Sequence, residues 1–276
     1  MITGLAHVEI VAIDLDAATS LYAALFDRAP IIATAALTCF QVGRLVVRLM
    51  PGRGDTPDGL SAVGFAVDDL SRAAVLAERR GLAIDHAMAT ENGLLRLSPS
   101  AAGGLAVHLV QTEHLGQTEV GAPTDATNDR PGIDRAGGEP GAVIGLDHVV
   151  IRTTDVTHAV AVLGGRLGLD LRLDRTNPAW RARMLFFRCG DSVVEVVQSM
   201  AGAADPPADI QINPPSPHQL WGLCWRVADA RAAHGRLAAA GIAGDAPRRG
   251  RRPATQVFTL AEPPAGVATL ILSVDA

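Results

Sequence analysis

The chain has 276 residues, a formal net charge of −5 and three cysteines, Cys39, Cys189 and Cys224. This length suits one or two domains with a sizeable core, and the negative charge gives no general attraction to nucleic acids or anionic membranes. Scattered cysteines, odd in number and without CxxC spacing, indicate buried free thiols in a reducing cytosol. Neither a signal peptide nor a bilayer-spanning apolar run is evident, so we expect a cytoplasmic protein.

The first predicted unit begins with the segment GLAHVEIVAID, which starts at Gly4 and is typical of a strand. It ends on Asp14, a residue type that caps helices, and residues 14–28 then carry apolar side chains at helical spacing. Three short strand-like runs follow, interrupted by Gly and Pro. The predicted order of this unit is therefore β-α-β-β-β.

The same order restarts three times along the chain, near Leu60, at Gly145 with the phrase GLDHVVIRTTD, and near Leu220. Such internal repetition indicates that one structural module has been copied. Glycines that can adopt a left-handed conformation are expected to end three of the helices, at Gly81, Gly168 and Gly241.

One segment interrupts the repeats and divides the chain. Residues 113–143 are rich in Gly, Pro, Asp and Thr and have few large apolar side chains. Such a composition does not bury enough surface to offset the entropy of ordering, so we expect a flexible linker. The predicted domains are residues 1–112 and 144–276, each with two βαβββ modules.

Four β-α-β-β-β copies, in which a GL-x-H-V strand precedes an Asp-capped helix, resemble the vicinal oxygen chelate superfamily. This superfamily includes glyoxalase I, bleomycin-resistance proteins and extradiol dioxygenases. The resemblance covers nearly the whole chain outside the linker. It implies an α+β fold whose modules pair into two half-open barrels, with a metal held inside by residues of first and last strands. It does not specify one activity.

The resemblance marks eight positions that could hold a metal, two in each copy. In chain order, they are His7, Arg48, Ala62, His108, His148, Glu195, Gly222 and Leu270. Those with side chains that could ligate are His7, His108, His148 and Glu195. Imidazole and carboxylate ligands with open positions suit a divalent ion such as zinc, nickel, iron or manganese.

The third copy has both a histidine and an acid at these positions. A lone carboxylate on an apolar strand face is costly unless it meets a cation or a donor. Glu195 is flanked by Val193 and Val197, so it needs a partner, and His148 is the obvious one. The two could share a metal or form a satisfied buried ion pair. In the first copy, His7 could simply pair with Glu9.

Module pairing decides which ligands meet. If copies pair in sequence, one barrel holds His7 with His108 and the other holds His148 with Glu195. If copy two pairs with copy three, one barrel gathers His108, His148 and Glu195 as a set of two histidines and one carboxylate. The long linker allows either arrangement, and it favours the sequential one slightly.

The leading functional hypothesis is a metal-dependent, glyoxalase-like lyase or isomerase acting on a small oxygenated substrate. Glu195 would then be a metal ligand and could also act as the base. The alternative is a metal-free barrel that sequesters a small molecule, as bleomycin-resistance proteins do. An extradiol dioxygenase is disfavoured because Gly222 and Leu270 replace ligands in the fourth copy. No nucleic-acid or membrane partner is expected, and a homodimer is left open.

One dense basic run, at residues 248–252, has two interpretations. It could be a solvated hairpin or strand end. It could also be an anion-binding site, since guanidinium groups have the hydrogen-bonding geometry to bind carboxylates and phosphates.

Overall fold

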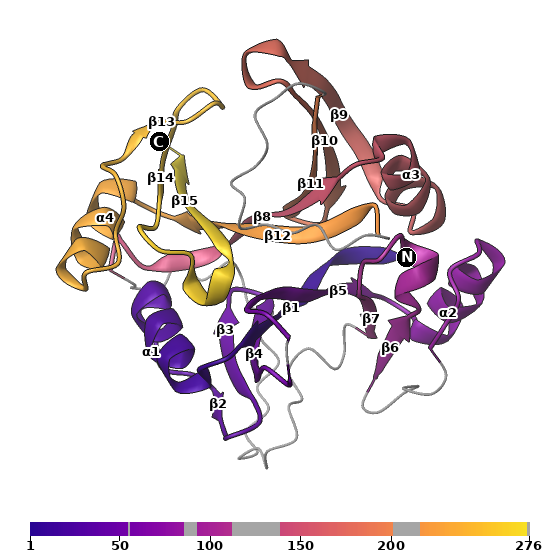
Figure 1. Cartoon of the computed structure of the whole chain (residues 1–276), viewed down its shortest axis with the longest axis horizontal. Helices are drawn as coiled ribbons and strands as arrows, with labels where there is room; N and C mark the ends of the chain where they lie inside the picture. Colours follow the sequence, from indigo (N-terminus) through magenta and orange to yellow (C-terminus); the bar gives the residue numbers. More distant parts are fainter. Residues whose placement is uncertain (55, 86–92, 112–138, 201–215, 275–276) are drawn as a thin grey trace.

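The computed structural model describes residues 1–54, 56–85, 93–111, 139–200 and 216–274. Two mixed sheets dominate this part of the chain, one in each half. Both are open and strongly curved rather than closed into cylinders (Figure 1). The predicted α+β fold with half-open barrels is therefore confirmed.

Among the described residues, the first two modules form a seven-stranded sheet with the order β2-β3-β4-β1-β5-β7-β6. The two first strands, β1 and β5, lie antiparallel at its centre and the remaining strands curl away on both sides (Figure 1). Its strands are β1 (Ile2–Ala12), β2 (Ile32–Ala33), β3 (Thr38–Val42), β4 (Leu45–Pro51), β5 (Gly59–Val67), β6 (Leu94–Leu97) and β7 (Val107–Gln111).

The third and fourth modules form an eight-stranded sheet in the described part of the chain, with the order β13-β14-β15-β12-β8-β11-β10-β9. Here β8 and β12 form the antiparallel centre. Its strands are β8 (Val143–Thr153), β9 (Asp170–Asn177), β10 (Ala182–Cys189), β11 (Ser192–Ser199), β12 (His218–Val227), β13 (Arg248–Arg249), β14 (Thr255–Thr259) and β15 (Ala268–Val274).

Each module carries one helix, and each helix begins after an aspartate whose side chain accepts a backbone N–H of the first turn. The helices are α1 (Leu15–Phe26), α2 (Leu70–Arg79), α3 (Val156–Val160) and α4 (Ala230–Ala239), capped by Asp14, Asp69, Asp155 and Asp229. A π-helical segment, Ala161–Arg166, extends α3. The predicted helix-ending glycines Gly81, Gly168 and Gly241 all have positive φ angles.

The two sheets pack back to back, with their concave faces turned away from each other and the helices at the two sides (Figure 1). One hydrophobic cluster runs through both halves. Within it, the ring of Phe26 on α1 meets the ring of Trp225 on β12 edge-on, with centroids 4.9 Å apart. The halves therefore share a core across their convex faces.

Modules pair in sequence, because β1 pairs with β5 in one sheet and β8 with β12 in the other. The exchanged arrangement is wrong for this chain. Residues 113–138, which make up most of the expected flexible linker (113–143), lie outside the described residues. The last residues of the linker do pack, since Pro140 accepts from the N–H of Asp229 and Gly141 accepts from Arg236.

Candidate functional site

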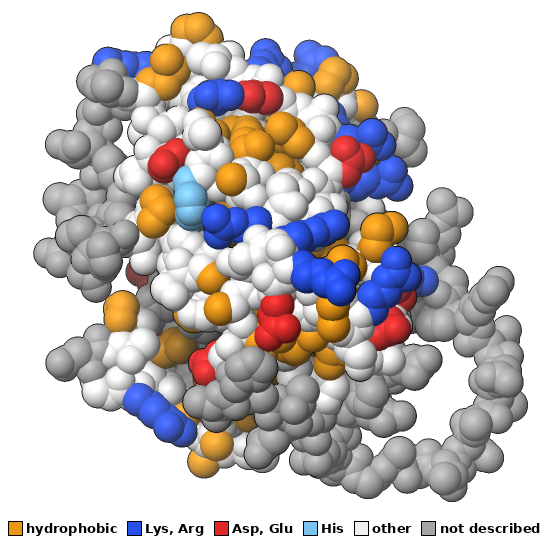
Figure 2. Space-filling view, turned by 90° about the vertical axis from the view of Figure 1, so that its right-hand side faces the viewer, with side chains coloured by type: hydrophobic (Ala, Val, Ile, Leu, Met, Phe, Trp, Pro, Cys, Tyr) orange, Lys and Arg blue, Asp and Glu red, His pale blue; other side chains and the backbone are white. Residues whose placement is uncertain are grey.

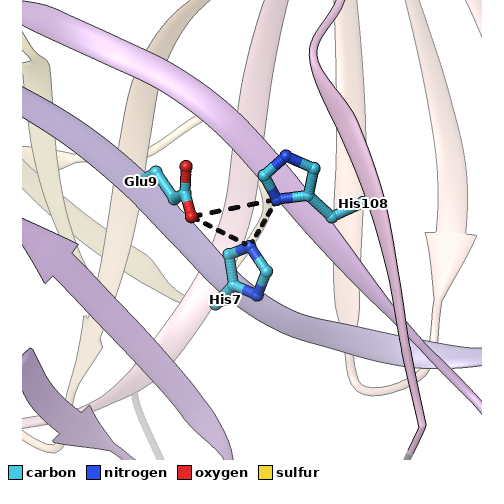
Figure 3. Close-up of side chains that lie close together, drawn as sticks. All are labelled: His7, Glu9 and His108. Atoms are coloured by element: carbon cyan, nitrogen blue, oxygen red, sulfur yellow. Dashed lines mark hydrogen bonds and ion pairs between the residues drawn. The ribbon is translucent and has the colours of Figure 1, made fainter. Parts of the chain in front are cut away.

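Three potential metal ligands converge on the concave face of the N-terminal sheet (Figure 3). His7 and Glu9 are two residues apart on β1, so both point to the face that is turned away from the main core. His108 comes from β7, which pairs with β5 so that His108 and His7 both face Gly64. Strand register thus brings together side chains that are about a hundred residues apart in sequence.

The three ligand atoms form a compact triangle. Nε2 of His7 lies 3.0 Å from Nδ1 of His108, and Oε1 of Glu9 lies 3.8 Å from the former and 3.9 Å from the latter. The circumradius of a triangle with sides of 3.0, 3.8 and 3.9 Å is about 2.1 Å, which matches nitrogen and oxygen distances to zinc. A single cation could therefore contact all three atoms with little rearrangement.

The triangle contains a buried polar atom with no hydrogen-bond partner. The three residues are 4–5% exposed, and Oε1 of Glu9 accepts no hydrogen bond. Nε of Arg48 lies 3.4 Å away, within ion-pair distance, but it forms no hydrogen bond with this oxygen or with any other described group. Leaving a buried carboxylate oxygen unsatisfied is costly, so a bound cation fits this position.

The electrostatic surroundings favour neutral imidazoles at this site. Burial, then the neighbouring His108 and the charges of Arg48 and Arg96, lower the pKa of His7 well below its usual value. Burial and the same two arginines lower the pKa of His108 to about 4. Metal ligation requires the neutral ring, so both histidines can donate lone pairs at neutral pH.

Gly64 makes room for the ring of His7. A Cβ atom at this position would lie 2.4 Å from Cε1 and Nδ1 of the imidazole and 2.8 Å from Nε2. Any larger residue at position 64 would displace the His7 ring from its present position. The absence of a side chain at Gly64 is therefore part of the geometry of the ligand cluster.

A second cluster lies in the C-terminal sheet, around His148 on β8. Its Nδ1 is 3.0 Å from Oδ2 of Asp147, and its Nε2 is 3.2 Å from Oε2 of Glu195 on β11. Cys224 on β12 faces it, and Asp147, His148 and Cys224 offer ligand atoms within 4.8 Å of one another. The predicted pair of His148 and Glu195 is thus in direct contact.

This second cluster is a network of paired charges. Arg226 and Arg252 lie 3.6 and 3.8 Å from Oδ1 of Asp147. Burial lowers the pKa of His148, but hydrogen bonds with Asp147 and Cys224 and the charge of Glu195 outweigh it and raise the pKa to about 10. Within the described residues, no polar side-chain atom of Asp147, His148 or Glu195 is buried without a partner.

Sequence reasoning paired Glu9 with His7 but did not recognise Cys224 as a neighbour of His148. Gly222 is the counterpart of His148 in the repeat, yet Gly222 pairs with Val150, and Cys224 pairs with His148. Antiparallel pairing of two similar strands displaces equivalent positions in this way. Aligning β8 and β12 as antiparallel neighbours, as the two-fold relation of the modules implies, could have placed Cys224 opposite His148.

Comparison with known proteins shows a family resemblance in the C-terminal half of the chain. Residues 147–258 match the model of the glyoxalase/bleomycin resistance protein/dioxygenase superfamily. The matched segment lies within the C-terminal half, and this segment is similar to the superfamily. No curated protein matches the chain in sequence.

Solved structures of the superfamily fold superpose on nearly the whole chain. The Mn(II)-bound glyoxalase from Novosphingobium aromaticivorans has a TM-score of 0.67 and 18% identity, with 99% of this chain and 84% of that chain covered. The 2,2',3-trihydroxybiphenyl 1,2-dioxygenase from Sphingomonas wittichii strain RW1 has a TM-score of 0.67 and 17% identity, with 99% and 91% covered. A mutant of 4-hydroxymandelate synthase from Streptomyces coelicolor has a TM-score of 0.71 and 14% identity, with 100% and 94% covered.

At these identities the superpositions support the fold alone. They cover both halves of the chain, whereas the superfamily model covers only part of the C-terminal half. Among the described residues, no helix is long and apolar enough to cross a membrane.

Proposed function

We propose that this chain is a divalent-metal-dependent enzyme, related to glyoxalases and acting as a lyase or isomerase on a small oxygenated substrate. His7, Glu9 and His108 would hold the metal in the N-terminal barrel. The observation that carries this proposal is the buried triangle of ligand atoms in which Oε1 of Glu9 has no hydrogen-bond partner. Two histidines and one carboxylate leave coordination positions open for a substrate.

When bound, a divalent ion would act as a Lewis acid toward a carbonyl or enediolate oxygen. The chain's own residues would supply orientation and proton transfer. Arg48 on β4 lies beside Glu9, and Arg96 on β6 pairs across the sheet with His108, so both would place positive charge near the oxygens of a substrate bound at the cluster. Glu9 is the carboxylate of the cluster and is the group that can accept a proton there.

The experiment that tests this proposal is a measurement of bound metal. The purified chain is reconstituted separately with manganese, iron(II), nickel and zinc, dialysed, and analysed by mass spectrometry for metal per chain. We expect close to one equivalent of one metal in the wild-type chain and a large loss in the isosteric variant Glu9→Gln. The matched variant Glu195→Gln, in the other barrel, should retain the metal.

Two outcomes would contradict this assignment. Loss of metal in Glu195→Gln but not in Glu9→Gln would move the centre to His148 and Glu195, as the sequence first suggested. Absence of near-stoichiometric metal in every reconstituted sample would exclude a metal enzyme of this kind.

The second candidate function is a metal-free binding module, and one observation favours it. The guanidinium of Arg48 lies 3.4 Å from Glu9, and both carboxylates around His148 are already paired with cations. A barrel whose charges are offset internally could sequester a small molecule without a metal. The same metal measurement separates the two candidates.

A further inference from the structure

The basic run at residues 248–252 divides into two parts that point to different places. Arg251 stacks on the ring of Trp180, with its Cζ atom 3.4 Å from the ring centroid, and Arg252 reaches Asp147. Arg248 and Arg249 instead form β13, at the edge of the C-terminal sheet (Figure 1). The run therefore lies in an exposed hairpin with β14, as the first interpretation expected, but its arginines differ in their contacts.

The turn between the two parts is tightly closed. A Cβ atom at Gly250 would lie 2.2 Å from Oγ1 of Thr255, and the N–H of Gly250 donates to the carbonyl oxygen of Thr255. Ala254 has a φ of 55°, in the left-handed region. These features hold the backbone of β13 in place, so the positions of Arg248 and Arg249 do not depend on a loose loop.

Arg248 and Arg249 line an open cleft together with Arg231 from the first turn of α4, and we call this the arginine cleft. Nε of Arg231 donates to Oε1 of Gln256 at 3.4 Å, which directs the guanidinium toward the β13–β14 side. The complete lining is Arg231, Pro247, Arg248, Arg249, Ala254, Thr255 and Gln256.

The arginine cleft has cations but no acid. Its lining contains three arginines and no Asp or Glu, and none of the three arginines has an ion pair among the described residues. Arginines elsewhere in the same sheet do, since Arg172 meets Asp170 at 3.2 Å and Arg183 meets Asp174 at 2.6 Å on the opposite edge. By contrast with the arginine cleft, the face of the molecule shown in Figure 2, which is the right-hand side of Figure 1, has basic and acidic side chains next to each other.

The three arginines are exposed, and no acid in the lining of the cleft offsets their positive charge. A cation in the first turn of a helix, as Arg231 is, meets the positive end of the helix dipole. Arg248 also adds a like charge beside Arg251, whose pKa is lowered by burial, raised by Glu195 and lowered by Arg248. The chain carries a net charge of −5, yet no carboxylate of the described residues lines this cleft. A bound anion would offset the repulsion.

We propose that the arginine cleft binds the phosphoryl group of a small ligand. Guanidinium groups donate paired hydrogen bonds to phosphate oxygens in a fixed planar geometry. Guanidiniums from three positions match an anion with three or more oxygens and up to two negative charges, whereas a carboxylate offers two oxygens and one charge. The cleft stands apart from the His7–Glu9–His108 cluster, in the other half of the chain, so it does not depend on the proposed metal centre.

The test is isothermal titration calorimetry of the full chain at low ionic strength with inorganic phosphate, methyl phosphate and acetate. The informative variant combines Arg248→Gln with Arg249→Gln. The matched control combines Arg172→Gln with Arg175→Gln, which removes the same charge from exposed positions on β9 at the other edge of the sheet. We expect saturable phosphate binding by the wild-type chain and the control, and affinity weaker by about tenfold or more in the cleft variant.

Each outcome decides something. Methyl phosphate bound at least as tightly as inorganic phosphate would identify an organic phosphate as the ligand class, and the reverse would identify the free ion. Equal affinity for acetate, equal losses in both double variants, or no saturable binding of either phosphate would overturn the proposal.

Discussion

Arg236 on α4 donates from Nη2 to the carbonyl oxygen of Leu25, at 2.9 Å, in the last turn of α1. The same guanidinium donates to the carbonyl oxygens of Ala24 and Gly141. One side chain of the C-terminal half thus satisfies carbonyls that the end of an N-terminal helix leaves free. A cation at this place also interacts favourably with the negative end of the helix dipole.

We therefore predict that Arg236→Gln destabilises the chain by about 2–3 kcal/mol, because charge-assisted hydrogen bonds to partly buried carbonyls are lost. The measurement is the free energy of unfolding from urea titrations. Arg231→Gln, on the exposed side of the same helix, is the control and should change it by less than about 0.5 kcal/mol. Equal effects of the two substitutions would show that the contact with α1 does not contribute.

A second prediction follows from the shared core. All three tryptophans, Trp180, Trp221 and Trp225, lie in the C-terminal half, whereas Phe40 lies in the N-terminal half and packs on Phe26. Phe40→Ala should cost about 3–5 kcal/mol through the cavity it creates. Because the halves share one core, tryptophan fluorescence and far-ultraviolet circular dichroism should report the same lowered urea midpoint. An unchanged fluorescence midpoint would mean that the halves unfold independently.

A third prediction concerns acid stability at the contact between α3 and β12. Nε2 of His218 lies 2.8 Å from Nδ1 of His158, and Nδ1 of His218 lies 2.8 Å from Oγ1 of Thr153. Burial and the neighbouring His158 lower the pKa of His218 to about 4, although Asp155 and a backbone hydrogen bond act in the opposite direction. The folded-state pKa is thus below the unfolded value of about 6.5.

The sign of the effect follows from that order. The unfolded chain binds the proton first, so the stabilisation is complete above about pH 6.5 and is lost as the pH falls toward 4, by about 1–3 kcal/mol. His7 and His108, whose pKa values are also lowered, add to the loss with the same sign. The difference in unfolding free energy between pH 7 and pH 5 should shrink in His218→Asn. The control is His234→Asn on α4, and an equal shrinkage there would contradict the prediction.

A fourth prediction tests the N-terminal ligand cluster without removing a ligand. Gly64→Ala introduces a methyl group where the His7 ring lies, so it should weaken metal binding by about tenfold or more. Gly145→Ala on β8, where a Cβ atom meets nothing within 4 Å, is the matched control. Competition with a chromogenic chelator measures both affinities. Unchanged metal affinity in Gly64→Ala would place the metal elsewhere.

Repetition made the modules predictable. Local signals sufficed for the aspartate caps, for the helix-ending glycines and for the position of His148 at the same distance from its cap as His7. These features arise from contacts within a few residues, which a sequence displays directly. The pairing of His148 with Glu195 was also accessible, because a carboxylate on an apolar strand needs a partner close by.

The ligand cluster itself required the tertiary structure. Which modules pair, and in which register, depends on how two curved sheets bury their convex faces against each other, and residues such as Phe26 and Trp225 reveal this only in space. That register brings His108 to His7 and sets Gly64 beneath the ring. It also brings Arg231 of α4 to the same cleft as Arg248 and Arg249.

By itself, the sequence predicted four repeated modules, the aspartate-capped start of each helix and a short set of candidate ligands, because these depend on local periodicity and on residue chemistry. Only the tertiary structure decided that Glu9 completes a buried triangle with His7 and His108, and that three arginines from α4 and β13 share one cleft. The physical reason is that unsatisfied carboxylates and unneutralised cations are defined by what surrounds them, and those surroundings come from distant parts of the chain.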